Sequence, residues 1–260
     1  MRVNLEKITL GYVNSGNQAV INDLSVNFRK DEFVAILGPS GCGKTSLLKA
    51  IAGLLPIQSG HIDFPDFSAK GKPSRLMAFQ DHCLFPWMNV VDNIGIGLEA
   101  KGHPRAFREA RAINMLKTIG LVQIAKMMPH ELSGGMKQRV SLLRLLVSDG
   151  DVLLFDEPLS AIDAQTRLLL QQELLDLWSA NPKTSIYVTH DIEEALILAD
   201  RVIVLSAQGG NILADIKVPL PRPRHATARP PKELEDLRWK IWSLLAKPVV
   251  STPSFRLVAS

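Results

Sequence analysis

The chain has 260 residues, of which 46% are hydrophobic and 22% are charged, and its formal net charge is +4. This length allows one or two domains with a buried core. The basic excess is small and spread along the chain, so it gives no argument for binding nucleic acid, and we expect no nucleic-acid partner.

Several other classes of protein are excluded in the same way. No apolar run reaches the ~18–20 residues that a membrane-spanning helix needs, and residues 1–7 lack the apolar core of a signal peptide. The two cysteines, Cys42 and Cys83, do not form a disulfide framework, and the six histidines lack metal-ligand spacing. We therefore expect a protein that is made and kept in the cytosol, without a zinc site.

The first residues, within 2–37, predict β-strands, because segments such as Leu24–Phe28 alternate apolar and polar side chains. Tyr12 lies near the end of the first of these strands, before a turn-prone segment. An aromatic ring at this place is able to stack on a nucleobase. The sequence leaves open whether Tyr12 does so or is a rim residue without a ligand.

A glycine-rich loop follows the apolar strand Phe33–Leu37 and precedes the helical pattern Leu47–Ala52. Its residues are Gly38, Pro39, Ser40, Gly41, Cys42, Gly43, Lys44, Thr45 and Ser46. The pattern G-x-x-x-x-G-K-[ST] between a strand and a helix is typical of a phosphate site, in contrast to a simple glycine turn. Backbone N–H groups converge on an anion there. Lys44 is placed to contact the β- and γ-phosphates, and the Thr45 hydroxyl to contact Mg²⁺.

After this loop the chain changes in texture. The helix runs to Gly53, a short strand is predicted within 61–67, and a buried strand over 75–79 ends at Gln80. A glutamine amide at a strand end is able to contact both Mg²⁺ and a water, although Gln80 by itself favours simple exposure. The segment 83–150 predicts a helical insertion with helices over 90–98, 106–119 and 122–128. The apolar link Leu84–Met88 at its front is either a small core or a docking surface.

A second anion site is predicted at the end of this insertion. Ser133 is a good helix N-cap, and Gly134 and Gly135 expose backbone N–H groups at the start of a helix that runs to Val147. This site lies far along the sequence from Lys44, so the two sites need not share one phosphate within one molecule.

The next strand, Val152–Phe155, is uniformly apolar, as in a parallel sheet buried on both faces. It ends at Asp156 and Glu157, of which one is able to hold Mg²⁺ and the other to polarise an attacking water. A helix over 164–180 and a strand over 184–189 follow, and this strand delivers His190. Because ligand sites lie at the carboxyl ends of parallel strands, the glycine loop, Gln80, the carboxylates and His190 are predicted to converge.

The last part of the chain predicts a strand over 201–205, a short strand from Asn211 and a proline-rich linker over 219–231. The linker contains the densest basic stretch, 222–229, which we interpret as a solvated tail. Residues 232–245 show helical periodicity with one leucine-rich face, which predicts a helix packed back on the body.

These motifs, together and in this order, resemble the ATP-binding subunits of ABC transporters over nearly the whole chain. The residues that carry the resemblance are the loop at 38–45, Gln80, Leu132-Ser133-Gly134-Gly135, Leu154 to Pro158, Ser160 to Asp163, and His190. The resemblance implies an α/β P-loop NTPase fold with a RecA-like core, an antiparallel β subdomain and a helical subdomain at about 83–150. The ATPase domain would span 1–218, followed by the linker 219–231 and a C-terminal helix and tail, 232–260.

The resemblance also implies roles for single residues. ATP would be bound by Tyr12, by the loop residues Gly38, Pro39, Ser40, Gly41, Cys42, Gly43, Lys44, Thr45 and Ser46, and by Ser133, Gly134 and Gly135. Mg²⁺ would be held by Thr45, Gln80 and Asp156. Glu157 would be the general base and His190 the γ-phosphate sensor, with Gln80 and Lys44 completing the catalytic set.

The partners implied are a second copy of the chain, transmembrane permease subunits and, indirectly, a solute-binding protein. Ser133 and Gly135 would act on the nucleotide of the second copy, and Asp163 would lie across that interface. Residues 84–94 are similar to the nitrate, taurine and aliphatic-sulfonate importer group, which implies a peripheral protein at the cytoplasmic face of the membrane. The alternatives are a soluble ABC ATPase without transport and a P-loop kinase, against which Ser133-Gly134-Gly135 argues.

Cys42 carries one further prediction. Its position among backbone amides and beside Lys44 favours the thiolate, so thiol reagents would inhibit and ATP would protect. The alternative is a buried, inert thiol.

Overall fold

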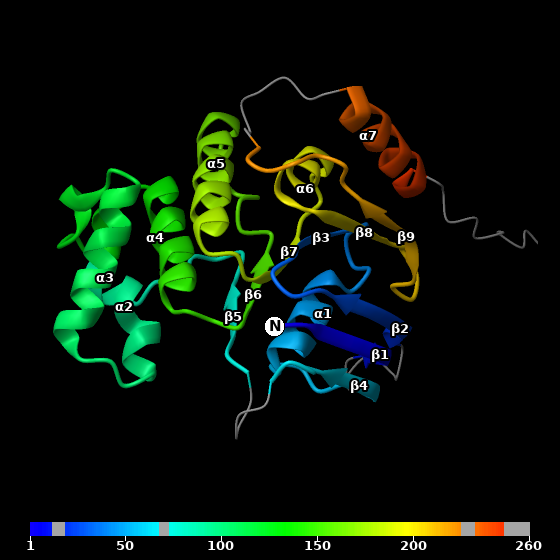
Figure 1. Cartoon of the computed structure of the whole chain (residues 1–260), viewed down its shortest axis with the longest axis horizontal. Coiled ribbons are helices and arrows are strands. Elements are labelled where there is room, and N and C mark those ends of the chain that lie inside the picture. The colour runs from blue at the N-terminus through cyan, green and yellow to red at the C-terminus, as the bar shows by residue number, and fades with distance from the viewer. Residues whose placement is uncertain (12–18, 68–72, 225–231, 247–260) are drawn as a thin grey trace, which may run out of the picture.

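Two β-sheets with helices on both sides form the body of the molecule in the computed structural model, which describes residues 1–11, 19–67, 73–224 and 232–246 (Figure 1). The larger sheet has the strand order β5-β6-β7-β3-β8-β9. Adjacent strands in this sheet are parallel, except for β8 and β9, which pair antiparallel. The strands are β5 (Arg75–Ala78), β6 (Val152–Asp156), β7 (Thr184–Val188), β3 (Phe33–Leu37), β8 (Arg201–Leu205) and β9 (Ile212–Lys217).

The central strand β3 explains why its sequence is continuously apolar. Phe33, Ala35 and Leu37 contribute to one hydrophobic core, whereas Val34 and Ile36 contribute to a second core on the other face. Side chains of a strand alternate between faces, so a strand that is covered on both sides needs apolar residues at every position. The predicted parallel sheet is therefore confirmed.

The smaller sheet is antiparallel, with the order β2-β1-β4, and it packs with α1 (Lys44–Ala52) in the second core. Its strands are β1 (Val3–Gly11), β2 (Ala19–Phe28) and β4 (Ser59–Asp63). The strand predicted within 61–67 thus begins and ends earlier than expected. Gly60 explains the register, because a Cβ there would lie 2.3 Å from the Glu6 carbonyl oxygen of β1.

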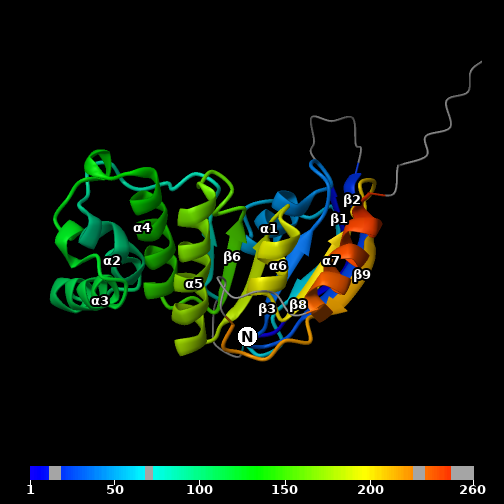
Figure 2. The same ribbon diagram turned by 90° about the horizontal axis from the view of Figure 1, so that it is seen from above.

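Three helices cover the opposite face of the larger sheet: α5 (Ala164–Ala180), α6 (Ile192–Leu198) and α7 (Lys232–Leu245) (Figure 2). The predicted packing of α7 is confirmed, since Leu234 and Ile241 are buried in the first core. Helix α6 is missing from the expectations because its seven residues span only about two turns, too few for a clear periodicity.

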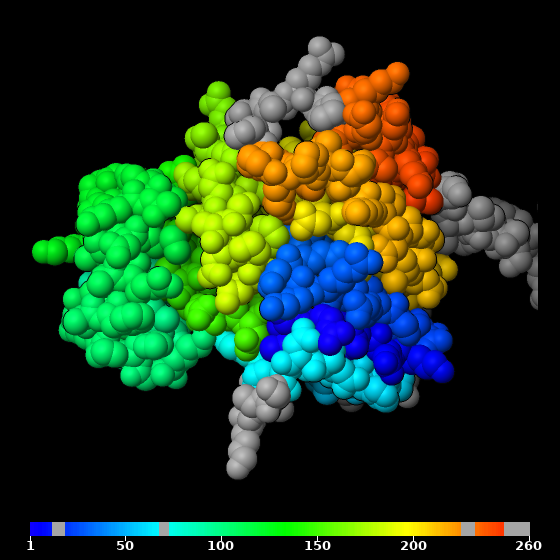
Figure 3. Space-filling view, viewed as in Figure 1, coloured from blue at the N-terminus to red at the C-terminus, as the bar shows by residue number. Residues whose placement is uncertain are grey.

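The helical insertion forms a lobe beside the sheets (Figure 3). It contains α2 (Val90–Ala100), α3 (Arg105–Thr118) and α4 (Gly134–Val147), with the short 3₁₀ helices η1 (Val122–Ile124) and η2 (Pro129–Glu131). The helix predicted over 122–128 is therefore only the turn η1. Gly97 allows α2 and α4 to approach closely, because a Cβ at this position would meet the Ser148 hydroxyl at 1.9 Å.

The expectation of a solvated tail is wrong for the described part of the proline- and arginine-rich stretch. The guanidinium of Arg224 is almost fully buried and donates to the carbonyl oxygens of Leu196, Ala199 and Leu220. Arg222 pairs with Asp200 at 2.9 Å. These carbonyls come from the C-terminal end of α6 and its surroundings, which the sequence of the stretch could not indicate. The remainder, 225–231, lies outside the described residues.

Candidate functional site

The residues predicted to converge do meet at one edge of the larger sheet. The glycine loop follows β3, Asp156 ends β6, and His190 comes two residues after β7. These three strands are neighbours, and Val188 of β7 is level with both Asp156 and Ile36. Gln80 follows β5 at the same carboxyl end. The parallel pairing therefore places polar side chains from distant segments beside one another.

The glycine loop has the backbone shape of an anion cradle. Gly43 caps α1 with φ of 103°, and a Cβ there would lie 2.7 Å from Ile21. Gly41 has φ of 80°, and a Cβ at this position would meet nothing within 4 Å, so the space beside it is open. Side chains are disfavoured in this left-handed conformation, so the two glycines let the loop turn its N–H groups inward.

Lys44 is the charged group of this loop, and it is almost fully buried. Its ammonium donates to the carbonyl oxygens of Gly38, at 2.7 Å, and Pro39, at 2.9 Å. These two bonds hold a buried cation against the loop that it belongs to. A phosphate group entering the loop would meet this charge together with the positive end of α1.

Thr45 and Asp156 form the most buried polar pair of the site. The Thr45 hydroxyl donates to the Asp156 carboxylate at 2.8 Å. Burial raises the pKa of Asp156 above its ordinary value of 3.8, although the hydrogen bond from Thr45 opposes the rise. A buried carboxylate with one hydroxyl partner is short of positive charge. These two hard oxygen ligands suit Mg²⁺, which takes few protein ligands and completes its shell with phosphates and water.

Glu157 and His190 form a second pair beside the first. The Nδ1 atom of His190 lies 2.9 Å from the carboxylate of Glu157. Glu157 has φ of 45°, a left-handed conformation that is costly for a side-chain-bearing residue, and its N–H donates to the Val188 carbonyl oxygen. The bond to the neighbouring strand and the strained backbone together turn the Glu157 carboxylate toward the imidazole.

Gln80 contacts the site through a different residue from those expected. Its amide nitrogen lies 3.5 Å from the Ser160 hydroxyl, which itself donates to the Glu157 carbonyl oxygen at 2.9 Å. Ser160 is thus a connecting residue that the sequence pattern contained but did not single out. The signal that would have found it is its position three residues after Glu157, at which a hydroxyl commonly bonds back to the chain.

The second anion site has the predicted cap but lies apart from the first. The Ser133 hydroxyl accepts a hydrogen bond from the Met136 N–H at 3.3 Å. Ser133 and Gly135 line one side of a hollow of about 460 Å³, with Asp163 and Thr166 opposite. No residue of the glycine loop lines this hollow, and α4 packs in the first core whereas α1 packs in the second. The two predicted anion sites are therefore separate within one chain.

Two predictions for single residues meet different outcomes. Cys42 is buried, and burial raises the pKa of its thiol, so the expectation of a favoured thiolate is wrong. The nearby Lys44 charge lowers the pKa by less than burial raises it. Tyr12 lies outside the described residues, and its stacking on adenine stays a prediction.

A comparison with protein families matches residues 21–160, more than half of the chain, to the model described as ABC transporter. The chain belongs to the ABC transporter ATPase family. The match includes the glycine loop, the Ser133 turn and both carboxylates, and the chain is an ATP-binding ATPase of this family.

Curated relatives extend the match over most of this ABC ATPase. It is 39% identical over 254 residues to an uncharacterized ABC transporter ATP-binding protein of Methanocaldococcus jannaschii, covering 97% of this chain and 94% of that protein. It is 43% identical over 223 residues to an aliphatic sulfonates import ATP-binding protein of Rhodococcus jostii, covering 86% of each. It is 42% identical to a taurine import ATP-binding protein of Rhizobium johnstonii, covering 75% of this chain and 74% of the relative.

Solved structures place the ABC ATPase among known cassettes. A dimeric bacterial ABC transporter cassette has a TM-score of 0.71 at 28% identity, and the match covers 83% of this chain and 98% of that one. A post-hydrolysis form of such a cassette, bound to ADP and phosphate, has a TM-score of 0.72 at the same identity and coverage. The predicted fold class is confirmed.

The link 84–88 of the ABC ATPase is held by Asn93, which lies within the segment 84–94 that resembles the importer group. Asn93 is completely buried, and its amide bonds the Phe85 N–H and the carbonyl oxygens of Phe85 and Met88. Phe85 lines a groove of about 400 Å³ between β5, α2 and α4. Trp87 is 70% exposed beside it, so the link presents an aromatic surface next to the groove.

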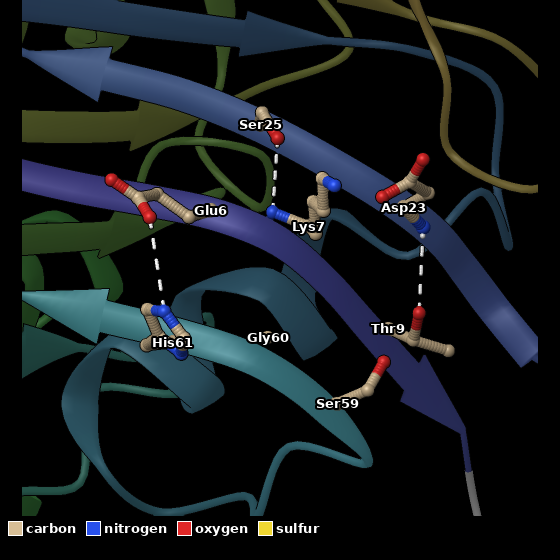
Figure 4. A pocket seen from close by; sticks show the side chains of 8 residues that line it. All are labelled: Glu6, Lys7, Thr9, Asp23, Ser25, Ser59, Gly60 and His61. Carbon is tan, nitrogen blue, oxygen red and sulfur yellow. Dashed lines mark hydrogen bonds and ion pairs between the residues drawn. The ribbon is translucent and has the colours of Figure 1, made fainter.

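A polar hollow of about 820 Å³ lies on the antiparallel sheet, away from these residues (Figure 4). Its lining residues include Glu6 and His61, whose side chains face each other at 3.7 Å. Within the described part of the chain no group of three histidine, cysteine or acidic residues is placed to hold a metal ion, and no helix there is long and apolar enough to cross a bilayer.

Proposed function

We propose that this ABC ATPase energises the import of a small solute, an anion of the nitrate, sulfonate or taurine type. The observation that carries the proposal is the identity of about 40% with sulfonate and taurine import ATP-binding proteins over most of the chain. The intact set of polar pairs at the sheet edge supports an active rather than a degenerate subunit.

ATP binding would begin at the glycine loop. The phosphates enter the cradle formed by the loop N–H groups, and Lys44 exchanges its bonds to Gly38 and Pro39 for bonds to phosphate oxygens. Thr45 and Asp156 would hold Mg²⁺, which would supply positive charge to the phosphates. Gln80 would complete this shell if its amide moved away from Ser160.

Hydrolysis would follow at the second pair. Glu157 would accept a proton from the attacking water, because its carboxylate lies at the end of β6 next to Asp156 and beside His190. His190 lies next to this carboxylate and contacts the γ-phosphate. Its bond to Glu157 keeps the two side chains in one relative orientation.

A second copy of the chain would complete each pocket. The hollow beside Ser133 and Asp163 is a half-site without a glycine loop of its own, and a similar cassette is dimeric. Two chains placed head to tail would bring Ser133 and Gly135 of one copy onto the nucleotide of the other. ATP then bridges the copies and favours the closed dimer, and hydrolysis weakens the bridge.

Transport requires further subunits. We place transmembrane permease subunits at the groove beside Phe85 and Trp87, where an apolar surface is exposed. A solute-binding protein would act through the permease. The subunit itself would be peripheral, at the cytoplasmic face of the membrane. An ABC ATPase that acts on soluble assemblies is the alternative.

Uptake by a reconstituted complex separates the two functions. The chain is co-expressed with candidate permease subunits, and the complex is placed in vesicles with taurine, an alkanesulfonate or nitrate on the side opposite to the ATPase. We expect ATP-dependent accumulation of one of these anions, which Lys44→Ala abolishes. Hydrolysis without permease binding would favour the alternative.

The variant Glu157→Gln tests the site itself. It keeps the shape of the side chain but removes the base, so we expect turnover to fall by at least 100-fold while ATP binding is kept. Size-exclusion chromatography with light scattering would show an ATP-dependent dimer of this variant and a monomer with ADP. Unchanged hydrolysis would remove Glu157 from the role of base.

A further inference from the structure

His190 depends on its neighbours for its position. Its side chain is 61% exposed, and it contacts the side chain of Glu157. The backbone on either side of it is held much more firmly. Thr189 is buried, its hydroxyl donates to the Glu194 carboxylate, and the same oxygen accepts the Asp191 N–H at 3.1 Å.

Asp191 extends this anchoring to α6. One carboxylate oxygen accepts the N–H groups of Glu193, at 2.9 Å, and Glu194, at 3.1 Å, so Asp191 is the N-cap of the helix. The other oxygen faces Arg167 of α5 at 3.6 Å. The residue that directly follows His190 is therefore connected both to its own helix and to a neighbouring one.

Helix α5 makes a second contact of the same kind. The Gln171 amide donates to the Glu194 carboxylate at 3.3 Å, and both side chains are buried. Arg167 and Gln171 are four residues apart and thus share one face of α5. This face contacts the segment 189–194 at two points, on either side of the first turn of α6.

Arg167 also contacts the loop that leads into α5. Its guanidinium donates to the Ile162 carbonyl oxygen at 2.8 Å. This loop, 160–163, contains Ser160, which contacts both Gln80 and Glu157, and it ends at Asp163, the N-cap of α5. One guanidinium therefore links the loop at the second half-site with the segment that bears His190.

We propose that Arg167, assisted by Gln171, is a positioning residue for hydrolysis that sets His190 relative to Glu157 according to the position of the loop 160–163. The inference rests on the proposed role of His190 in the reaction. When a second copy moves this loop, the guanidinium transmits the movement to Asp191 and so to the adjacent histidine. Arg167 acts through Asp191 and the loop 160–163, with which its guanidinium makes contact.

Three substitutions separate the contacts of Arg167. Arg167→Met keeps much of the side-chain length and removes every donor, whereas Arg167→Lys keeps the charge but not the planar fork that bridges two partners. Asp191→Asn keeps an N-cap acceptor and removes the charge that faces Arg167. Lys183→Met is the matched control, because it removes a half-buried ion pair with Asp149, at 3.0 Å, at the opposite end of β7.

The measurement is steady-state hydrolysis by the full chain, together with binding of a fluorescent ATP analogue and the melting temperature. We expect Arg167→Met and Asp191→Asn to lower kcat about tenfold or more, since small misplacements of a reacting group have effects of this size. KM and analogue affinity should stay within about twofold, because the glycine loop is untouched. The double variant should be no slower than the slower single variant, and Arg167→Lys should restore part of kcat.

Lys183→Met should keep the wild-type kcat. A kcat of Arg167→Met and Asp191→Asn equal to that of the control would overturn the inference, and so would a loss explained by unfolding or matched by weaker nucleotide binding. If Arg167→Met does not fold, Arg167→Lys and Asp191→Asn decide in the same way. If the Lys44→Ala variant hydrolysed ATP at the wild-type rate, the proposed function would be overturned, and this inference with it.

Discussion

The buried carboxylate of Asp156 lowers the stability of the empty protein and at the same time suits the binding of a cation. Its carboxylate is almost fully buried, and the Thr45 hydroxyl donates to it at 2.8 Å. Burial raises its pKa, which means that the folded, nucleotide-free chain holds the charged form at a cost. A bound cation would remove this cost, so the same residue favours the loaded state over the empty one.

Asp156→Asn should therefore stabilise the empty protein and abolish hydrolysis. The asparagine removes the buried charge while keeping an acceptor for Thr45. We expect the melting temperature without nucleotide to rise by about 2 °C or more, with no measurable turnover. A lower melting temperature of the variant at neutral pH would contradict the interpretation.

The pH dependence of this effect has a definite sign. The folded-state pKa of Asp156 lies above the unfolded one, so the native chain binds the proton more strongly, and the unfolding free energy falls as pH rises from the ordinary value of 3.8 through the raised value. The advantage of the variant over the wild type should thus be larger at about pH 7 than at about pH 4. Parallel thermal melts of the two chains check this.

Arg224 shows how an element is anchored from outside. Its guanidinium lies against the carbonyl groups at the C-terminal end of α6, where the negative end of the helix dipole favours a cation. Burial lowers its pKa to about 10, so it is still charged at neutral pH. The segment that leaves β9 is thereby fixed to the helix that follows His190.

Arg224→Met should destabilise the fold by about 2–3 kcal/mol, because several buried carbonyl oxygens lose their donor. Chemical denaturation measures this loss. The control is Arg238→Met, which removes an exposed ion pair with Glu193 at 3.1 Å and should cost less than about 0.5 kcal/mol. Equal losses in the two variants would mean that the burial of Arg224 contributes nothing.

The link 84–88 depends in the same way on Asn93 of α2. Its buried amide bonds the Phe85 N–H and the carbonyl oxygens of Phe85 and Met88, beside the link's own turn bond from the Met88 N–H to the Phe85 carbonyl oxygen. Asn93→Ala should cost about 1–3 kcal/mol, since both donors and acceptors of the link lose their partner.

In the reconstituted complex this variant should keep the hydrolysis of the free subunit within about twofold but lose stimulation by the permease, because the aromatic surface is no longer presented. Asn114→Ala on the exposed face of α3 is the control, and it should change neither quantity. Full stimulation of Asn93→Ala would show that the link does not contact the permease.

At the scale of the whole molecule, the separation of the two half-sites is the main feature. The glycine loop leads into α1, which packs in the second core, whereas the Ser133 turn leads into α4, which packs with α5 in the first core. Each composite pocket in a head-to-tail dimer would take one half from each chain.

Mixing two inactive variants tests this arrangement. Lys44→Ala disables the glycine loop, and Ser133→Arg blocks the turn that would meet the partner's nucleotide. A mixed dimer holds one pocket with both defects and one pocket with neither, so mixing should restore up to about a quarter of the wild-type rate. If each pocket were built within one chain, mixing would restore nothing.

Much of the fold followed from local patterns. The continuous apolar run of β3 and its glycine loop predicted a strand covered on both faces and a phosphate cradle, because both depend on residues that are adjacent in the chain. Helix α6 was too short to be predicted. The contacts of Gln80 with Ser160 and of Arg224 with the end of α6 depend on atoms from remote segments, and no spacing in the sequence indicates them.

The sequence by itself determined the family and the residue types of the site. It also indicated that the polar residues after several strands meet, since parallel strands bring their carboxyl ends to one edge of the sheet. Only the tertiary structure decided the state of each group there. It buried Cys42 and so raised the pKa of the thiol, it turned Gln80 toward Ser160, and it held His190 between two anchored neighbours. Burial and hydrogen bonding depend on which segments pack around a residue in the folded chain, and the local sequence around that residue does not specify them.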